Sequence, residues 1–370
     1  MKKKYIFITL FFVLSISMLF SNTAEVKNVI ILVSDGMGFN HMYFSELLAE
    51  QNDLIPATRD FQKICLGLNY TADNLITDSA AAATAIFRGE RTNLGYLGLN
   101  PDKEELESIG EFFKDKGWSV AIITNTVYSD ATPAGVYAST PSRKDVEEIT
   151  YDLINNDFID VLVAGGLEKL GVNPFTGKPK RNSKLEKLAA SGYDIKGINF
   201  RDLMPAHGEK KGTMAFVTMG DMNFEDDKIP GEPSFLKAVQ KGLSYLDDDG
   251  NLFAMIECGR VDDACHINSD ESVMAELLEF QKVLGFLLEK YPTDETLLIV
   301  LSDHETGGIC INSGYPDGSN ISFQWGSSDH TGSYVPVLVR GNGSESFNGI
   351  FHIEELFPKI KGLFLEKEGD

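Results

Sequence analysis

Residues 29–38 read VIILVSDGMG, a run of five apolar residues and a serine that is followed by an aspartate and two glycines. An unbroken apolar run of this length, bounded by a turn signal, is typical of a strand buried on both faces of a parallel sheet. Asp35 would then stand at the carboxyl end of that strand, where Gly36 allows a close turn. Taken alone, this pair indicates a turn as readily as a metal ligand.

Further runs rich in Val, Ile and Leu recur along the chain and alternate with helical patterns. The predicted strands lie at residues 29–34, 119–124, 161–164, 214–218, 252–256, 297–302 and 335–339. The predicted helices lie at residues 103–116, 142–155, 183–191, 234–246 and 271–289. This alternation predicts an α/β fold, a three-layer α/β/α sandwich with a mostly parallel central sheet, in a single domain over residues 25–370. Residues 166–211, rich in Gly and Lys, are expected to form surface excursions away from the chemistry.

The first 24 residues have the composition of a signal peptide. Three lysines follow Met1, an apolar run covers about residues 5–20, and small polar residues follow it, so cleavage after Ser21 or Ala24 fits. A single membrane anchor is the alternative, but a bilayer span needs roughly 20 apolar residues. We expect an exported protein, periplasmic or extracellular, without stable membrane association after cleavage.

The formal net charge of −22 argues against nucleic acid or an anionic membrane surface as a partner, because both would repel the chain. An anionic substrate would need a local positive charge, which bound metal could supply. The four cysteines show no CxxC spacing, so disulfides and buried free thiols both stay open. They are Cys65, Cys258, Cys265 and Cys310.

A serine stands near the start of a run of strong helix formers, TDSAAAATA, at residues 77–85. Ser79 could be only a helix cap. A helix N-terminus also binds anions and favours an ionised hydroxyl, but serine becomes a good nucleophile only when a base or metal lowers its pKa. The role of Ser79 therefore depends on whether metal ligands lie nearby.

Candidate metal ligands appear in the segment IECGRVDDACH, residues 256–266. Glu257 stands at the end of a predicted strand. Asp262 and His266 are four residues apart, so a helix would place them on one face, one turn apart, as a metal clamp requires.

Two later segments add further candidates at predicted strand edges. Asp303 and His304 leave one strand together, and His330 comes just before another. Zinc accepts mixed imidazole and carboxylate ligands, and a pair of metals can clamp the attacking and leaving oxygens of a phosphoryl group. The residues alone therefore predict a metallohydrolase.

Six motifs, in order through nearly the whole chain after residue 24, resemble the alkaline phosphatase family. They are VSDGMG at Asp35, TDSAAAAT at Ser79, SDATPA at Asp130 with Arg143 beyond it, IECGRVDDACH, SDHETGG and DHTG. The resemblance implies an alkaline phosphatase-like fold and hydrolysis of small-molecule phosphate monoesters to alcohol and inorganic phosphate. It also makes a homodimer an expectation.

The resemblance implies a role for each matched residue. Ser79 would be the nucleophile that forms a phosphoseryl intermediate, and the planar fork of Arg143 would hold two nonbridging phosphate oxygens. Two zinc ions and one magnesium ion are implied. The first zinc would be held by Asp262, His266 and His330, the second by Asp35, Asp303 and His304 beside Ser79, and the magnesium by Asp35, Thr132 and Glu257, with Asp130 one layer further out.

Two residues depart from the family pattern. Asp263 stands where relatives commonly carry Lys, His or Trp, and together with Asp130 it would make the third metal site unusually acidic. We expect tighter magnesium binding or another divalent ion there, which leaves the identity of that metal open. Cys258 stands where a small residue is common, and strand alternation should turn it away from Glu257, so packing is expected rather than ligation.

Three other functions fit the sequence less well. A sulfatase would need a modifiable Cys or Ser in a C/S-x-P-x-R setting, whereas Ser79 is followed by Ala80-Ala81-Ala82. A phosphodiesterase usually lacks the arginine and the third metal site, so Arg143, Thr132 and Glu257 favour monoesters. A catalytically silent phosphate- or metal-binding protein should have lost the nucleophile or a ligand, and every matched position is present.

Overall fold

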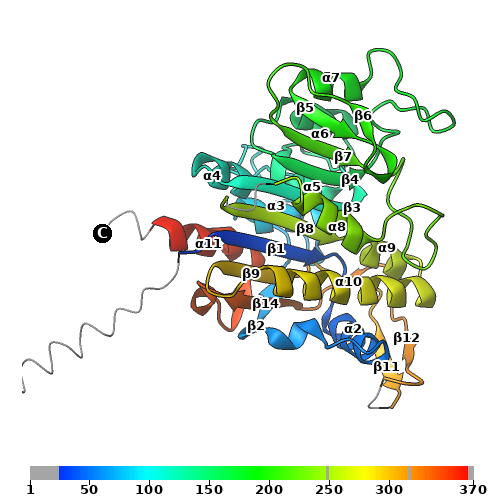
Figure 1. Ribbon diagram of the computed structural model, residues 1–370. Coiled ribbons are helices and arrows are strands. Elements are labelled where there is room, and N and C mark those ends of the chain that lie inside the picture. Colours follow the sequence, from blue (N-terminus) through cyan, green and yellow to red (C-terminus); the bar gives the residue numbers. More distant parts are fainter. Residues whose placement is uncertain (1–24, 247–249, 316–317, 366–370) are drawn as a thin grey trace, which may run out of the picture.

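The computed structural model describes residues 25–246, 250–315 and 318–365. The predicted signal peptide lies outside the described residues. The strands of the central sheet are β1 (Asn28–Ser34), β2 (Lys63–Leu68), β3 (Ser119–Val127), β4 (Val161–Gly165), β5 (Tyr193–Lys196), β6 (Asp202–Met204), β7 (Gly212–Phe216), β8 (Leu252–Cys258), β9 (Thr296–Leu301), β14 (Val335–Gly341) and β15 (Ile350–His352). They lie side by side in the order β15-β2-β14-β9-β1-β8-β3-β4-β7-β5-β6 (Figure 1).

The middle of this sheet is parallel, as its unbroken apolar runs predict. β1 pairs in parallel with β8 on one side and β9 on the other, and β3 continues the parallel order beyond β8. Every residue of 29–33 is fully buried, because helices cover both faces of the strand. Within the described part of this sheet, antiparallel pairing is confined to β14, against β9 and β2, and to β6, against β5.

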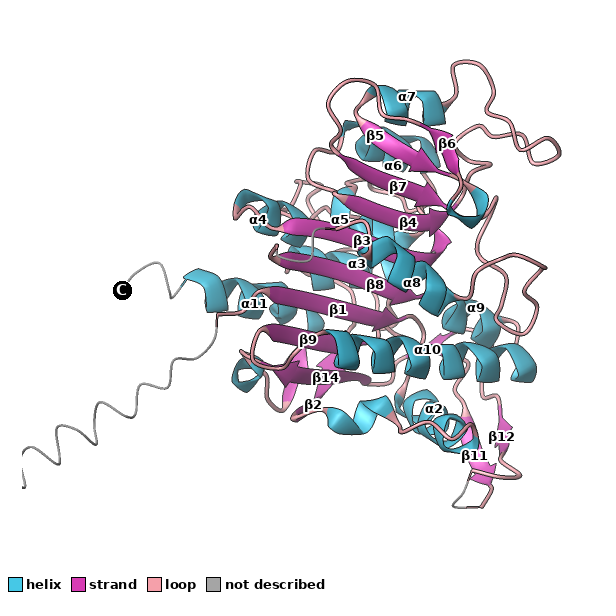
Figure 2. Cartoon of the chain, viewed as in Figure 1, coloured by secondary structure: helices cyan, strands magenta, loops and turns pink. Residues whose placement is uncertain are grey.

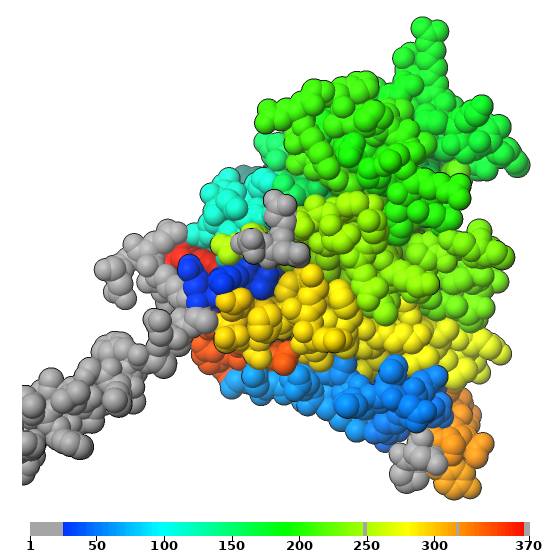
Figure 3. Space-filling view, in the orientation of Figure 1, coloured from blue at the N-terminus to red at the C-terminus, as the bar shows by residue number. Residues whose placement is uncertain are grey.

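Helices cover both faces of the sheet and complete the predicted three-layer sandwich (Figure 2). One face carries α2 (Phe39–Gln51), α8 (Phe235–Leu243), α9 (Arg260–His266) and α10 (Asp270–Lys290). The other face carries α3 (Ser79–Arg88), α4 (Ile109–Asp115), α5 (Ala131–Tyr137), α6 (Val146–Asn155), α7 (Lys184–Ala190) and α11 (Leu356–Leu365). Figure 3 shows α2 in blue beside α10 in yellow, which together close the first face. The predicted α/β fold is confirmed.

Three sequence predictions on the elements were wrong in detail. The helix expected from residue 103 begins at Ile109, because Ser108 and Glu111 form a capping box there and Lys103 has a left-handed φ of 67°. The helix expected from residue 142 begins at Val146, so Arg143 lies in the turn before it. Residues 166–211 are more than surface excursions, since they contain α7, β5 and β6, and β5 extends the sheet by pairing with β7.

Small elements complete the chain. Two short pairs lie outside the main sheet, β10 (Glu305–Thr306) with β13 (His330–Thr331) and β11 (Cys310–Ser313) with β12 (Ser322–Gln324). The 3-10 helices are η1 (Ala57–Asp60), η2 (Ile198–Phe200), η3 (Ser344–Ser346) and η4 (Ile353–Glu355).

All four cysteines are free thiols, and Cys258 is buried in the apolar cluster that α10 covers. Burial, followed by the charges of Glu276 and Glu279 on α10, raises the pKa of the Cys258 thiol. Within the described ranges, no helix is both long and apolar enough to cross a bilayer.

Candidate metal centre

The predicted ligands meet at the carboxyl edge of four neighbouring strands, β9, β1, β8 and β3. Parallel strands bring their carboxyl ends to one edge of a sheet, which is where ligands bind in such folds. Asp303 follows β9, Asp35 follows β1, Glu257 lies in β8 and Asp130 follows β3. Strand order therefore brings together four carboxylates that are far apart in the chain.

The first cluster consists of Asp262 and His266 on α9 and His330 on β13. Helical spacing places the first two on one face, and His266 Nε2 lies 3.2 Å from Asp262 Oδ2 and 3.2 Å from His330 Nε2. The Nδ1 atoms of the two histidines lie 2.7 Å from the Ser328 carbonyl and 2.8 Å from the Thr77 carbonyl. A neutral imidazole that donates from Nδ1 has a bare Nε2. Without a cation, the hydrogen bond with Asp262 raises the pKa of His266 to about 9. A cation that displaced this proton would face two imidazole nitrogens and a carboxylate, a donor set that suits zinc.

The second cluster surrounds the hydroxyl of Ser79, the first residue of α3. His304 Nε2 lies 3.1 Å from Ser79 Oγ, 3.2 Å from Asp303 Oδ2 and 3.4 Å from Asp35 Oδ1. All four side chains are buried. Within the described chain, neither Asp303 Oδ2 nor Asp35 Oδ1 receives a hydrogen bond. Buried carboxylate oxygens without donors are costly unless a metal ion binds them, so this cluster also fits a cation.

The third cluster contains only oxygen ligands. One carboxylate oxygen from each of Asp35, Asp130 and Glu257 lies within 4.8 Å of the others. Thr132 Oγ1 lies 3.3 Å from Asp35 Oδ2, while Glu257 Oε1 is buried and receives no hydrogen bond from the described residues. Such a set suits a hard ion such as Mg²⁺. Asp130, expected one layer out, lies among the candidate ligands themselves.

Burial and neighbouring carboxylates raise the pKa of two of these carboxyl groups, whereas that of Asp262 stays low. Burial, followed by the charge of Asp130, raises the pKa of Glu257 to about 8. Burial, followed by the charge of Asp262, raises the pKa of Asp303 to about 6. Burial also acts on Asp262, but the hydrogen bond with His266 and the nearby histidine charges hold its pKa below the usual range. A metal ion would favour the ionised form of all three carboxyls.

Chelation should therefore destabilise the fold, and more at high pH than at low pH. A carboxyl whose pKa is raised from 4.5 to about 8 stabilises the metal-free fold below its unfolded pKa, and this stability is lost as pH rises through 8. We expect the loss of Tm on chelation, measured by calorimetry, to be larger at about pH 9 than at about pH 6. When both proteins are kept metal-free by chelator, the Tm of Glu257→Gln should fall less from about pH 6 to about pH 9 than the Tm of the wild type, because glutamine does not ionise. Equal Tm with and without chelator would contradict metal binding here.

Arg143 is aimed at this edge by two carboxylates. Its Nη1 lies 3.3 Å from Asp78 Oδ2 and its Nη2 lies 3.4 Å from Asp130 Oδ1. Asp78 also caps α3 by accepting from the backbone of Ala81, so one residue positions both the guanidinium and the helix that begins at Ser79. Sequence reasoning missed Asp78, although its N-cap position directly before the serine was a usable signal.

Asp263 lies apart from the three clusters. Its Oδ2 is 2.5 Å from Arg260 Nη1, and its side chain is 44% exposed. Partial burial of this side chain raises the pKa of Asp263 to about 6, although the positive charge of Arg260 acts to lower it. The arginine thus offsets part of the acidity that the sequence predicted for the third site.

A glycine is required at position 36, because α9 comes very close to the backbone there. Its φ is +75°, and a Cβ there would lie 2.8 Å from Asp262 Oδ1. Only glycine adopts this conformation without strain and also lets α9 come so close to the end of β1. The first and second clusters can therefore adjoin.

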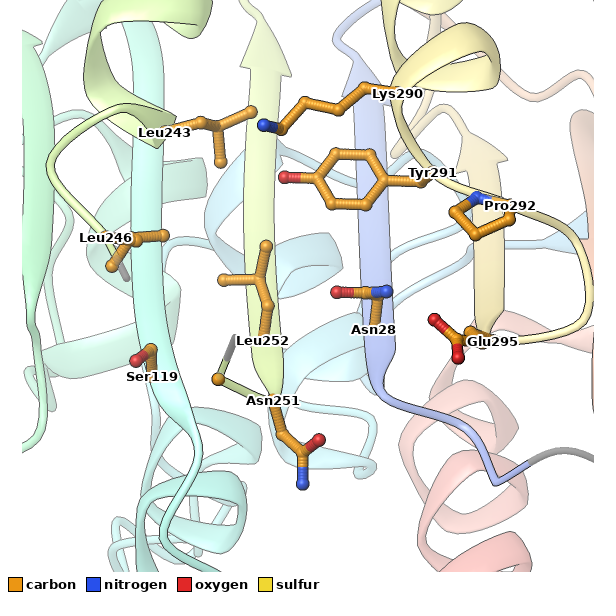
Figure 4. A pocket seen from close by; sticks show the side chains of 11 residues that line it. Asn28, Ser119, Leu243, Leu246, Asn251, Leu252, Lys290, Tyr291, Pro292 and Glu295 are labelled. Carbon is orange, nitrogen blue, oxygen red and sulfur yellow. The ribbon is translucent and has the colours of Figure 1, made fainter. Parts of the chain in front are cut away.

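A separate pocket of about 270 Å³ opens at the opposite edge of the sheet. Asn28, Ser119 and Leu252 line it at the starts of β1, β3 and β8, with Tyr291 across from them (Figure 4). The residues that line it include none of the candidate ligands.

The geometry agrees with the comparisons to known proteins. The family model described as alkaline phosphatase matches residues 26–323. The chain belongs to the alkaline phosphatase family. The repressible alkaline phosphatase of Saccharomyces cerevisiae is 28% identical over 93% of this chain and 68% of its own length. Alkaline phosphatase 4 of Bacillus subtilis is 26% identical over 78% of this chain and 63% of its own length.

Solved structures of the family support the same fold. The His 135 Glu variant of TAB5 alkaline phosphatase, with Mg bound in its M3 site, superimposes with a TM-score of 0.79 and is 26% identical, covering 92% of this chain and 99% of its own. The present chain spans about two thirds of the length of the yeast and Bacillus alkaline phosphatases.

Proposed function

We propose that this member of the alkaline phosphatase family hydrolyses phosphate monoesters through a phosphoserine at Ser79, with two zinc ions and one magnesium ion. The observation that carries the proposal is the position of Ser79 Oγ, 3.1 Å from His304 Nε2 at the edge of a carboxylate cluster. The Ser79 hydroxyl therefore lies beside the second cluster, where a bound cation would lower its pKa and make it a better nucleophile.

The donor sets fit the proposed metals. The first zinc would be held by Asp262, His266 and His330, whose side chains lie close together. The second would be held by Asp35, Asp303 and His304, and the magnesium by Asp35, Asp130, Thr132 and Glu257. His304 also lies within 4.8 Å of Asp262 and His330, so the two zinc sites would adjoin at this ring. When bound, the zinc ions supply positive charge that favours the ionised serine and the leaving oxygen.

The chain's own residues account for the rest of the reaction. Ser79 Oγ attacks phosphorus in line with the leaving alcohol, and the new ester is later hydrolysed by water to release inorganic phosphate. The guanidinium of Arg143, held by Asp78 and Asp130, binds two nonbridging oxygens of the phosphoryl group. Ser79 gains further support from the N-terminus of α3, where the helix dipole favours negative charge.

Monoester and diester substrates with the same leaving group test this proposal. We expect 4-nitrophenyl phosphate to be hydrolysed at least about a hundredfold faster than bis(4-nitrophenyl) phosphate, measured as kcat/KM. The diester has one nonbridging oxygen and one negative charge fewer, so it would gain less from the positive charge that Arg143 and bound metal would supply. Elemental analysis of the same preparation should give two zinc ions and one magnesium ion per chain. A diester rate equal to or above the monoester rate would favour a phosphodiesterase instead.

A further inference from the structure

The hydroxyl of Thr306 lies between the two proposed zinc sites. Its Oγ1 is 2.5 Å from Asp262 Oδ1, in the first cluster, and 3.1 Å from His304 Nδ1, in the second. Thr306 is fully buried, on the short strand β10. It therefore contacts one ligand of each site without belonging to either ligand set.

Proton counting fixes the direction of both hydrogen bonds. A threonine hydroxyl has one hydrogen to donate, and a carboxylate can only accept. The hydrogen of Thr306 therefore goes to Asp262, and the hydroxyl oxygen must accept from His304 Nδ1. The ring of His304 then carries its hydrogen on Nδ1 and presents a bare Nε2 to Ser79 and the second cluster.

Two backbone contacts hold Thr306. Its N–H donates to the Gly36 carbonyl at 3.0 Å, next to Asp35, and Thr306 pairs with His330 across β10 and β13. These contacts fix the Thr306 hydroxyl relative to both clusters. A shift of the hydroxyl would change its hydrogen bonds to Asp262 and to His304 together.

We propose that Thr306 is a positioning residue that couples the two zinc sites, by orienting Asp262 for the first and by fixing the metal-binding tautomer of His304 for the second. This inference rests on the proposed function. It predicts that loss of one hydroxyl weakens zinc binding at two sites, although Thr306 is a ligand of neither.

The test compares Thr306→Val, which keeps the branched shape without the hydroxyl, with Thr306→Ser, which keeps the hydroxyl. Zinc affinity is measured on the full chain by competition with a chromophoric chelator. We expect Thr306→Val to weaken both zinc sites about 10- to 100-fold, the effect typical of residues that orient metal ligands, and Thr306→Ser to stay near the wild type. Thr331→Val makes the same change on the paired strand β13, where the hydroxyl donates to Glu305, and should leave both affinities unchanged.

Two outcomes would overturn the coupling: unchanged zinc affinity in Thr306→Val, or a loss confined to one site. Absence of zinc binding in the wild type would instead overturn the proposed function, whatever the variants do. The tautomer is tested independently in the metal-loaded wild type by ¹⁵N NMR of labelled histidine, so a variant that fails to fold does not end the test. His304 should show a protonated Nδ1, and an unprotonated Nδ1 would refute the proposal.

Discussion

Replacing Ser79 with alanine should reduce kcat for monoester hydrolysis by roughly a thousandfold or more, without loss of bound metal. The change removes the only hydroxyl that lies within hydrogen-bonding distance of His304 Nε2 among the described residues. The ligands of both proposed zinc sites stay in place, and alanine is a good residue for the first turn of α3. The measurement is kcat with 4-nitrophenyl phosphate, together with elemental analysis of zinc and mass spectrometry of the peptide around residue 79 after acid quenching.

Ser183→Ala is the matched control. Ser183 also stands at a helix start, where its hydroxyl caps α7 far along the sheet from the metal centre. This control should lose about 1 kcal/mol of stability and keep its kcat. Full activity in Ser79→Ala, or phosphate trapped on another residue in the wild type, would exclude the covalent route through Ser79.

The sequence predicted the parts of this site that depend on local spacing. The apolar runs located the central strands, so Asp35 and Asp303 could be assigned to strand ends from the sequence pattern alone. The four-residue spacing of Asp262 and His266 was enough to place both on one face of α9, where they lie 3.2 Å apart. These predictions needed only the periodicity of one element.

The parts that depend on strand order or on loops could not be predicted in this way. β8 inserts between β1 and β3, and this non-local pairing brings Asp130 near Asp35 and Glu257. The edge strand β15 has only three residues, and the sequence of its neighbour β2, KICLGL, shows no alternation of polar and apolar residues, so neither strand was predicted. Arg143 was expected from the resemblance, yet its orientation follows from Asp78 in a distant segment. Export and a homodimer stay predictions from the sequence.

Asp262→Asn should lose one zinc ion and reduce kcat on the order of a hundredfold or more. Asp262 lies within 3.9 Å of His304 Nδ1 and His330 Nε2 as well as close to His266. Asparagine keeps the shape of the side chain but removes the negative charge that makes the group a zinc ligand. Its amide nitrogen cannot bind a cation, so at most the neutral carbonyl oxygen remains as a weaker ligand. Elemental analysis and kcat for the monoester are measured on one preparation.

Asp263→Asn makes the same chemical change at the next residue and separates the effect of ligation from that of local charge. Because Asp263 pairs with Arg260 and lies outside the three clusters, this variant should keep both zinc ions. Its effect should fall on the third site, where less acidity should weaken magnesium binding, measured as the magnesium concentration that gives half-maximal rate. Asp263→Lys should raise that concentration further, and an unchanged magnesium requirement in both variants would show that Arg260 already cancels the charge of Asp263. Equal zinc loss in Asp262→Asn and Asp263→Asn would mean that net charge on α9, rather than direct ligation by Asp262, controls the first zinc site.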